Sequence, residues 1–226
     1  MIKYVGFDKD GTLIDSSRAI TKEWGKIINQ DYGVDPKKAE EVFSITAAGQ
    51  PTDLQLELTL QGYGFSFSKD ELFIRASEIA VRLGKKVKAN PFPEVLGVLR
   101  ELKEKEYNIF LSSSHQETVV KEDLERTGLS EYVDYFVGAR PNQPSFKKGE
   151  SHFRNVSKYF NVPFDEFIKK AVFVGDTPPD IKAANDYGIV SVARLGSVPK
   201  EKLAEAGARF IVNDLKELPK ILSSLV

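Results

Sequence analysis

The chain has 226 residues, and its 32 lysines and arginines against 33 aspartates and glutamates give a formal net charge of −1. A balance this close to zero argues against a nucleic-acid partner held by a basic surface, because neutralising phosphates needs an excess of lysine and arginine. A hydrophobic share of 41% excludes intrinsic disorder, and the lack of cysteine excludes disulfides, thiolate nucleophiles and cysteine-bound metals.

The sequence also indicates where the protein works. Residues 1–8 hold too short an apolar stretch for a signal peptide, and no run approaches the roughly 18–20 apolar residues of a membrane span. We therefore expect a cytoplasmic protein that has no membrane partner. The sequence leaves open whether it is a monomer or a homodimer.

Six short apolar segments, each rich in Val, Ile, Phe or Tyr, predict β-strands. They lie at residues 2–7, 107–112, 133–137, 171–174, 189–193 and 208–212. Amphipathic stretches of helical length separate several of them. Short buried strands that alternate with helices indicate an α/β fold, with a doubly wound parallel sheet covered on both faces. We assign residues 1–15 and 91–226 to this core.

Residues 16–90 follow a different pattern and predict a helical domain inserted after the first strand. Apolar side chains recur at helical spacing in residues 20–28, 39–46 and 72–83. Leucines alternate with a period of two over residues 54–60, which alone indicates a strand. Pro51 suits the first turn of a helix and the neighbouring segments are helical, so we expect a helix there too. Prolines at 91 and 93 mark the return to the core.

The first predicted strand ends in two carboxylates, Asp8 and Asp10, which Gly11 and Thr12 follow. The carboxyl end of a strand is where ligands bind open α/β sheets. Gly11 permits the backbone conformation that an immediate turn needs. An ordinary acidic turn is the alternative, and a second acidic segment decides against it.

That second segment follows the strand at 171–174 and contains Asp176 and Asp180. If the two strands are neighbours, four carboxylates meet at one edge of the sheet. One such pair at ~4 Å costs about 4 kcal/mol at an effective dielectric of ~20, so a cation is needed. Oxygen ligands favour Mg²⁺ over zinc or copper, and Lys147 and Lys148 offer a second counter-charge.

In this order the segments resemble the four motifs of the haloacid dehalogenase (HAD) superfamily. Residues 8–12 resemble the first motif, and residues 110–114, a strand that ends in serine, resemble the second. The lysine pair resembles the third, and Gly175-Asp176 with Asp180 the fourth. The resemblance implies a Rossmann-like core. Because the insertion falls between the first and second motifs, it also implies the helical-cap subclass, which includes phosphoglycolate-phosphatase-like and β-phosphoglucomutase-like members.

The resemblance also implies roles for the acidic residues. Asp8 would attack phosphorus and form an aspartyl-phosphate, and Asp10 would protonate the leaving group and then activate water. Mg²⁺ would be held by Asp8, the backbone carbonyl of Asp10 and Asp176, with Asp180 supporting the site. Gly11 and Thr12 are expected to bind phosphate.

A serine hydroxyl from the second motif would bond a phosphoryl oxygen. We prefer Ser113, with Ser112 as the alternative and Ser114 as the following small polar residue that also faces phosphate. A purely structural interpretation makes the serine triplet the N-cap of the helix that begins near Glu117.

Two lysine positions depart from the family pattern. Lys147 has the spacing to Phe153 that resembles the usual third motif, whereas Lys148 precedes Gly149 and resembles a Lys-Gly-Glu variant; either can serve. Lys9 replaces the apolar residue common between the two aspartates. In extended geometry it should point away from them, so we expect it to change the local surface or the cap contact.

Further candidates are less specific. His115 follows the second motif and could contact substrate, although an exposed loop histidine is the commoner case; His152 falls in a predicted helix and suits a structural role. In the insertion, Gly49 and Gln50 interrupt the helical pattern and could read the substrate, with Arg18 as a weaker contact; a plain turn is the alternative. Trp24 belongs to an apolar stripe and suits the core of the cap.

The sequence therefore predicts a Mg²⁺-dependent phosphatase that acts on a small phosphorylated metabolite. A phosphomutase on the same scaffold is the nearest alternative, because an aspartyl-phosphate can also be returned to a substrate. A catalytically silent phosphate-binding or interaction module is the alternative from another class.

Overall fold

The computed structural model describes residues 1–47, 49–140 and 148–225. The chain forms two compact units: Met1–Asp15 with Asn90–Val226, called here the α/β unit, and Ser16–Ala89, called here the helical unit. Asn90 belongs with the α/β unit, one residue before the predicted boundary. Its carbonyl accepts a hydrogen bond of 3.0 Å from the backbone N–H of Asp15.

The described part of the α/β unit contains one parallel sheet of six strands. They are β1 (Tyr4–Phe7), β2 (Asn108–Gln116), β3 (Tyr135–Ala139), β4 (Ala171–Gly175), β5 (Val190–Arg194) and β6 (Phe210–Val212). Their order is β3-β2-β1-β4-β5-β6, with every neighbouring pair parallel. The predicted α/β class and all six predicted strands are confirmed, and β1 lies at the centre, where the strand order reverses.

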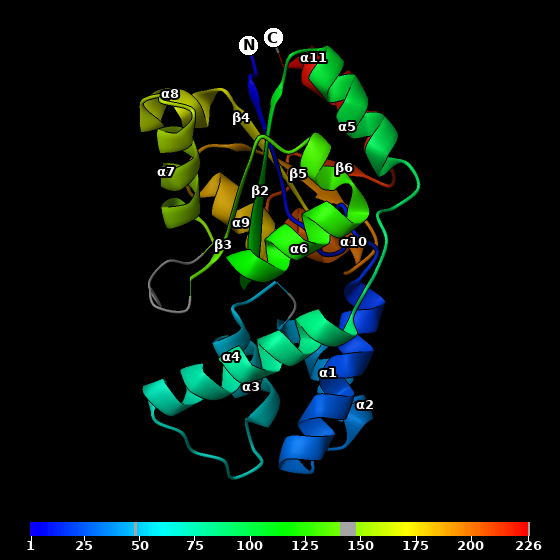
Figure 1. The fold of residues 1–226 in the computed structure, drawn as a ribbon, viewed down its shortest axis with the longest axis vertical. Helices are drawn as coiled ribbons and strands as arrows, with labels where there is room; N and C mark the ends of the chain where they lie inside the picture. The colour runs from blue at the N-terminus through cyan, green and yellow to red at the C-terminus, as the bar shows by residue number, and fades with distance from the viewer. Residues whose placement is uncertain (48, 141–147, 226) are drawn as a thin grey trace. The chain divides into compact units, whose positions relative to one another are not determined.

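Helices cover both faces of this sheet. They are α5 (Val95–Glu104), α6 (Glu117–Thr127), α7 (Glu150–Tyr159), α8 (Phe164–Lys169), α9 (Pro178–Asn185), α10 (Lys200–Glu205) and α11 (Leu218–Ser224), with short 3-10 turns η2 (Leu129–Glu131) and η3 (Leu215–Glu217). Figure 1 shows α7 and α8 on one side of the sheet and α5 and α11 on the other. On the α7 side, Phe110, Phe153 and Phe173 pack in one buried cluster. Each such ring contributes about 1.5–3 kcal/mol through its burial.

The helical unit consists of α1 (Ser17–Tyr32), α2 (Pro36–Val42), the π-helix η1 (Phe43–Ala47), α3 (Thr52–Leu60) and α4 (Lys69–Lys86). The segment with alternating leucines is helical, because Leu56 and Leu60, four residues apart, are both buried. Trp24 is fully buried, and its indole N–H donates to the hydroxyl of Thr59 at 3.2 Å. Its predicted place in the core of this unit is confirmed.

Helix ends in the helical unit follow the local sequence. Ser68 and Glu71 form a reciprocal capping box at the start of α4, which satisfies backbone N–H groups that have no partner inside the helix. Asp35 accepts the N–H of Lys38 at 3.1 Å at the start of α2. These caps fix where the two helices begin.

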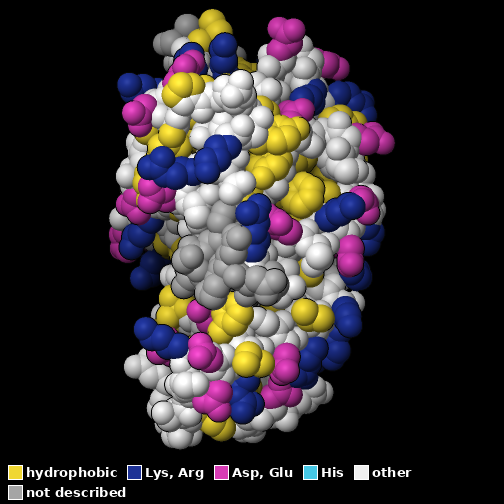
Figure 2. Space-filling model, turned by 60° about the vertical axis from the view of Figure 1, so that its left-hand side comes forward, with side chains coloured by type: hydrophobic (Ala, Val, Ile, Leu, Met, Phe, Trp, Pro, Cys, Tyr) yellow, Lys and Arg dark blue, Asp and Glu magenta, His cyan; other side chains and the backbone are white. Residues whose placement is uncertain are grey.

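The surface carries charges of both signs. Figure 2 shows lysine and arginine side chains interspersed with aspartate and glutamate over the face in view. Among the described residues, no helix is both long and apolar enough to cross a membrane.

Candidate active site

The chain leaves the sheet in a tight turn at the end of β1. Asp8 continues the hydrogen bonding of β1 by one residue, because its N–H donates to the Val174 carbonyl of β4 at 2.8 Å. Gly11 has φ 81°, in the left-handed region that favours glycine, and its N–H donates to the Ile14 carbonyl at 2.8 Å. The turn therefore presents Asp8 and Asp10 at the carboxyl edge of the sheet, beside the point where the strand order reverses.

Three buried carboxylates meet at this edge. One oxygen each from Asp8, Asp176 and Asp180 lies within 4.8 Å of the others. Asp176 directly follows β4, and Asp180 lies in the first turn of α9. Gly175 permits the close approach, because a Cβ there would lie 2.3 Å from the Cβ of Asp180. We call these three residues the acidic cluster.

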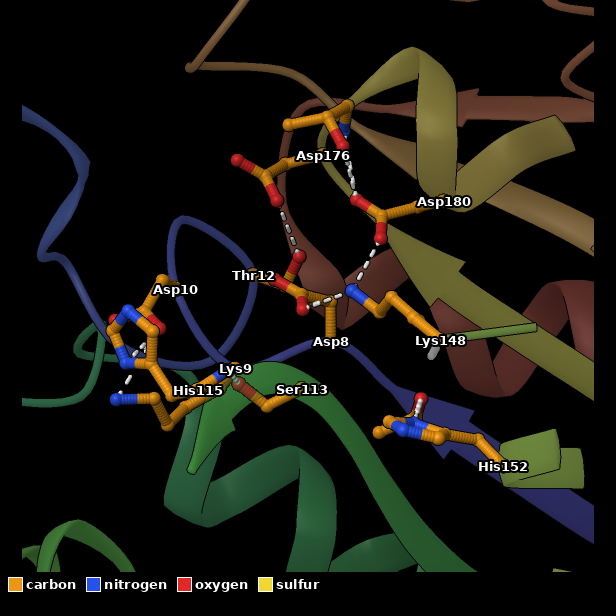
Figure 3. Close-up of polar contacts among 12 residues, drawn as sticks. Asp8, Lys9, Asp10, Thr12, Ser113, His115, Lys148, His152, Asp176 and Asp180 are labelled. Carbon is orange, nitrogen blue, oxygen red and sulfur yellow. Dashed lines mark hydrogen bonds and ion pairs between the residues drawn. The ribbon is translucent and has the colours of Figure 1, made fainter. Parts of the chain in front are cut away.

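Lys148 inserts its ammonium group into the acidic cluster. Its Nζ contacts Asp8 Oδ1 and lies 2.5 Å from Asp180 Oδ1 (Figure 3). Burial alone would lower the pKa of Lys148, but the carboxylates of Asp180 and Asp8 outweigh that effect and raise it, so the group stays charged. Lys147, the other candidate from the sequence, lies outside the described residues.

The negative charge of the acidic cluster is only partly offset. Burial, opposed by Lys148 and reinforced by the carboxylates of Asp180 and Asp10, raises the pKa of Asp8 from 3.8 to about 7. Burial and the charges of Asp8 and Asp180 likewise raise the pKa of Asp176 well above its ordinary value. A cation bound by these carboxylates would lower their pKa values.

The chemistry of the donors fits a hard divalent cation such as Mg²⁺. Asp176 Oδ1 accepts the hydroxyl of Thr12 at 3.0 Å, but Asp176 Oδ2 is buried and accepts no hydrogen bond within the described part of the chain. Both oxygens of Asp180 are engaged, one by Lys148 and the other by the N–H and hydroxyl of Thr177, at 3.1 and 2.6 Å. Asp8 and Asp176 therefore fit as ligands better than Asp180 does.

A second charged cluster lies on the other side of Asp8 (Figure 3). The ammonium group of Lys9 lies 2.5 Å from Asp123 Oδ2 and 3.2 Å from Asp10 Oδ2. Arg126 donates to the other oxygen of Asp123 at 3.0 Å. His115 Nδ1 lies 3.4 Å from Asp10 Oδ2. We call these five residues the Lys9 cluster.

The expectation that Lys9 changes the local surface is wrong, because its side chain is 2% exposed and pairs with Asp10 and Asp123. An effect of Lys9 on a contact with the helical unit stays a prediction. Burial lowers the pKa of Lys9, yet Asp10 and Asp123 more than compensate and raise it. His115 is also no exposed loop residue: it lies in β2 with a side chain 20% exposed, and burial lowers its pKa.

The three serines belong to β2 and do not cap the following helix. Gln116 is the N-cap of α6 and makes no side-chain capping bond, so the capping interpretation is wrong. Ser112 is fully buried and its hydroxyl is hydrogen-bonded to His152 Nδ1 at 2.9 Å. Ser113 is also buried, and its hydroxyl accepts the N–H of His115 at 3.1 Å. Ser114 follows, partly buried.

His152 lies in α7 and is fully buried. Burial, with the charges of Lys148 and Arg140, lowers its pKa from 6.5 to about 3, so the ring is neutral at physiological pH. Its hydrogen bond with Ser112 connects α7 to the second motif.

The remaining candidates from the sequence are Arg18, Gly49 and Gln50, which belong to the helical unit. Gly49 has φ 76°, which suits a turn. A contact between these residues and a substrate stays a prediction.

Sequence reasoning missed Asp123 as a member of the site. It is buried on α6 beside the buried Val120 and Leu124. An acidic residue on the apolar stripe of a helix that follows the second motif is the signal that could have found it, because buried carboxylates need a cationic partner. Lys9, which lies between Asp8 and Asp10 in the sequence, is the cationic partner of Asp123.

Comparisons with known proteins agree with this geometry. Residues 2–188 match the family of haloacid dehalogenase-like hydrolases. A Caldanaerobacter subterraneus protein named pyrophosphatase PpaX is 30% identical over 222 residues, which cover 98% of this chain and 94% of that protein. A phosphoglycolate phosphatase of Aquifex aeolicus is 28% identical over 190 residues, covering 83% of this chain and 82% of the relative.

Among solved structures, the fold is similar to that of a predicted phosphoglycolate phosphatase from Haemophilus somnus. The TM-score is 0.79 at 22% sequence identity, and the match covers 97% of each chain. With a family match that spans residues 2–188, most of its length, the chain belongs to the haloacid dehalogenase-like hydrolases.

Proposed function

We propose that the protein is a Mg²⁺-dependent phosphatase that hydrolyses a small phosphorylated metabolite through an aspartyl-phosphate intermediate. The observation that carries the proposal is the acidic cluster of Asp8, Asp176 and Asp180 around the Lys148 ammonium group. Carboxylates close enough together to hold a cation, with a buried ammonium group beside them, are parts that phosphoryl transfer requires.

Asp8 is the proposed nucleophile. An oxygen of its carboxylate attacks phosphorus, the bond from phosphorus to the leaving oxygen breaks, and Asp10 gives that oxygen a proton. Asp10, now ionised, takes a proton from water, which attacks the aspartyl-phosphate and releases inorganic phosphate. The separation of the two carboxylates supports this division of labour, because Asp10 Oδ2 faces Lys9 while Asp8 Oδ1 faces Lys148.

Asp8, Asp176 and the backbone carbonyl of Asp10 are the proposed metal ligands. When bound, the cation supplies positive charge that lowers the pKa of Asp8 and offsets the charge of the phosphoryl group. Asp180 holds Lys148 and caps α9, so its proposed role is to orient the lysine that binds a phosphoryl oxygen.

Among the serines, Ser113 is the preferred phosphate ligand and Ser112 the alternative. The Ser113 hydroxyl accepts the N–H of His115 and keeps its own proton to donate, whereas the fully buried Ser112 hydroxyl is already hydrogen-bonded to His152. Gly11 and Thr12 use their N–H and hydroxyl groups inside the protein, so we assign them to the turn and to the orientation of Asp176.

The proposed substrate class rests on the relatives. One lysine, one hydroxyl and one cation suit the phosphoryl group of a phosphorylated compound. The names of the relatives make phosphoglycolate and pyrophosphate the first compounds to test.

The decisive experiment measures turnover of an aryl phosphate with and without Mg²⁺, for the wild type and for Asp8→Asn. We expect Mg²⁺-dependent release of inorganic phosphate by the wild type and a loss of at least about a thousandfold in the variant. Asp186→Asn removes an exposed carboxylate of the same unit and is the matched control, which should retain activity.

Three outcomes would contradict the proposal. Full activity of Asp8→Asn excludes the nucleophile. Conversion of a sugar phosphate to its isomer without phosphate release identifies a phosphomutase. Metal binding without turnover of any phosphate ester indicates a silent binding module.

A further inference from the structure

Lys9 is a buried charge that the proposed mechanism does not use. It lies between Asp8 and Asp10 in the chain, and its side chain is 2% exposed. Burying an ammonium group is costly unless paired carboxylates offset the lost hydration. A residue that serves packing alone needs no charge at this position, so the pairing of Lys9 needs an explanation.

The two carboxylates that Lys9 contacts come from distant parts of the chain. Asp10 lies in the active-site turn, 3.2 Å away, and Asp123 lies on α6, 2.5 Å away. Asp123 is itself fixed, because Arg126 donates to its second oxygen at 3.0 Å and Thr127 donates to its backbone carbonyl at 2.6 Å. Lys9 therefore connects the turn to a helix that packs on the sheet.

Lys9 contacts the same oxygen of Asp10 that His115 approaches. Both Lys9 Nζ and His115 Nδ1 lie near Asp10 Oδ2, at 3.2 and 3.4 Å. The ion pair with the anchored Lys9 restricts the rotation of the Asp10 carboxylate, and His115 lies close by without a hydrogen bond from its Nδ1 within the described residues. A proton donor helps a leaving group only if it is held within hydrogen-bond reach of the leaving oxygen.

We propose that Lys9, anchored by Asp123, is a positioning residue that holds the Asp10 carboxylate where it protonates the leaving group. The inference rests on the proposed phosphatase function and assigns a second task to the first motif. Lys9 does not touch the substrate in this arrangement. It acts through Asp10, in the step in which the phosphorus–oxygen bond breaks and the proton of Asp10 moves to the leaving oxygen.

The test compares substrates whose leaving groups differ in their need for that proton. Nitrophenolate leaves 4-nitrophenyl phosphate without protonation, whereas an alkoxide requires it. The alkyl substrate is the one that the wild type hydrolyses fastest in a panel that includes phosphoglycolate and glycerol phosphate. The quantity compared is kcat/KM, which includes only the steps up to departure of the leaving group and so excludes the later attack by water.

For Lys9→Met we expect kcat/KM to fall roughly tenfold to a hundredfold more for the alkyl phosphate than for 4-nitrophenyl phosphate, because the general-acid contribution is selectively weakened. Asp123→Asn keeps Lys9 but removes the charge that fixes it, and should show the same selectivity with a smaller amplitude. This second variant serves if Lys9→Met does not fold.

Lys103→Met is the matched control, because it breaks another lysine–aspartate pair of the same unit, with Asp134 at 2.6 Å. It should change both substrates by the same factor. An equal loss on both substrates for Lys9→Met and Asp123→Asn, or no loss, overturns the positioning role while leaving the phosphatase intact. A wild type that releases no phosphate from either substrate overturns the proposed function itself.

Discussion

Two buried lysines lie on either side of Asp8, and each contacts two aspartates, yet their surroundings differ in charge. Among the described residues, the acidic cluster sets three carboxyl groups against the ammonium group of Lys148, an excess of two acidic groups. The Lys9 cluster sets two carboxylates against Lys9 and Arg126, which balance. The first cluster has the charge deficit that a divalent cation would fill, and the second is complete without one.

The difference explains why similar contacts support different tasks. A balanced, buried cluster holds its members in one arrangement, because moving one charged group would leave its partner buried without a counter-charge. A cluster with excess negative charge instead attracts cations and shifts the pKa values of its own carboxylates. Changes to one cluster at a time, by substitution, pH or Mg²⁺, therefore test this difference.

Of the two buried lysines, the one in the acidic cluster should have the larger effect on activity when it is removed. In Lys148→Met, kcat on 4-nitrophenyl phosphate should fall by roughly a hundredfold to a thousandfold, because a charged donor to the phosphoryl group is lost. Lys9→Met should lose far less on this substrate. Steady-state kinetics of both variants test the contrast, and equal losses would show that the two lysines are equivalent.

The pH dependence of stability should differ between metal-free wild type and Asp8→Asn. Between about pH 4 and pH 7, the folded protein retains a proton on Asp8 that the unfolded chain has released, so stability falls as pH rises through this window. The raised pKa corresponds to a contribution of up to about 4 kcal/mol.

Denaturant unfolding at several pH values, with EDTA present, measures this contribution as the difference between the two proteins. Subtraction is needed because His152, whose pKa is lowered to about 3, has the opposite sign and gains stability as pH rises towards 6.5. Saturating Mg²⁺ should abolish the decline. A pH-independent difference would mean that Asp8 is ionised without the metal.

Mg²⁺ itself should stabilise the folded protein, by about 3 kcal/mol at a concentration a hundredfold above its dissociation constant. Thermal unfolding with and without the ion measures this effect. Asp176→Asn should abolish most of it, whereas Asp123→Asn should retain it. If both variants respond to Mg²⁺ like the wild type, the ion binds elsewhere.

The smallest effect on stability is expected for Arg126, the partly exposed arginine of the Lys9 cluster. Arg126 is 30% exposed, so Arg126→Met should lower the free energy of unfolding by less than about 1 kcal/mol. Arg154→Met, which breaks an exposed pair with Glu150, is the reference. Urea denaturation compares them, and a loss of several kcal/mol for Arg126→Met would show that the balance of the cluster depends on this arginine.

Most of the α/β fold could be predicted because buried parallel strands are short, continuous apolar runs. The end of β2 could not, since its polar serines look like a loop; pairing of Gln116 with Ala139 of β3, past an irregular register, extends the strand. The π-helix Phe43–Ala47 was also missed, because its residues follow the same apolar spacing as an α-helix.

The candidate site divides along the same line. Asp8, Asp176 and Asp180 could be predicted to meet one of the two neighbouring lysines, because ordered motifs and strand ends bring them to one edge, and the structure shows that Lys148 does so. The contact between Lys9 and Asp123 joins residues 114 positions apart, and it depends on how the turn after Asp8 bends. Gly11 predicts a turn, but it does not predict which side of the turn the Lys9 side chain lies on.

The chain enters and leaves the helical unit at two segments that are hydrogen-bonded to each other. Leu13 accepts the N–H of Phe92 at 3.0 Å, Asp15 donates to Asn90 at the same distance, and Ile14 pairs antiparallel with Pro91. Residues 13–15 and 90–92 are thus held side by side at the two ends of the inserted segment. A segment of different length or sequence could be attached at these two adjacent ends without changing the hydrogen bonds that hold the ends together.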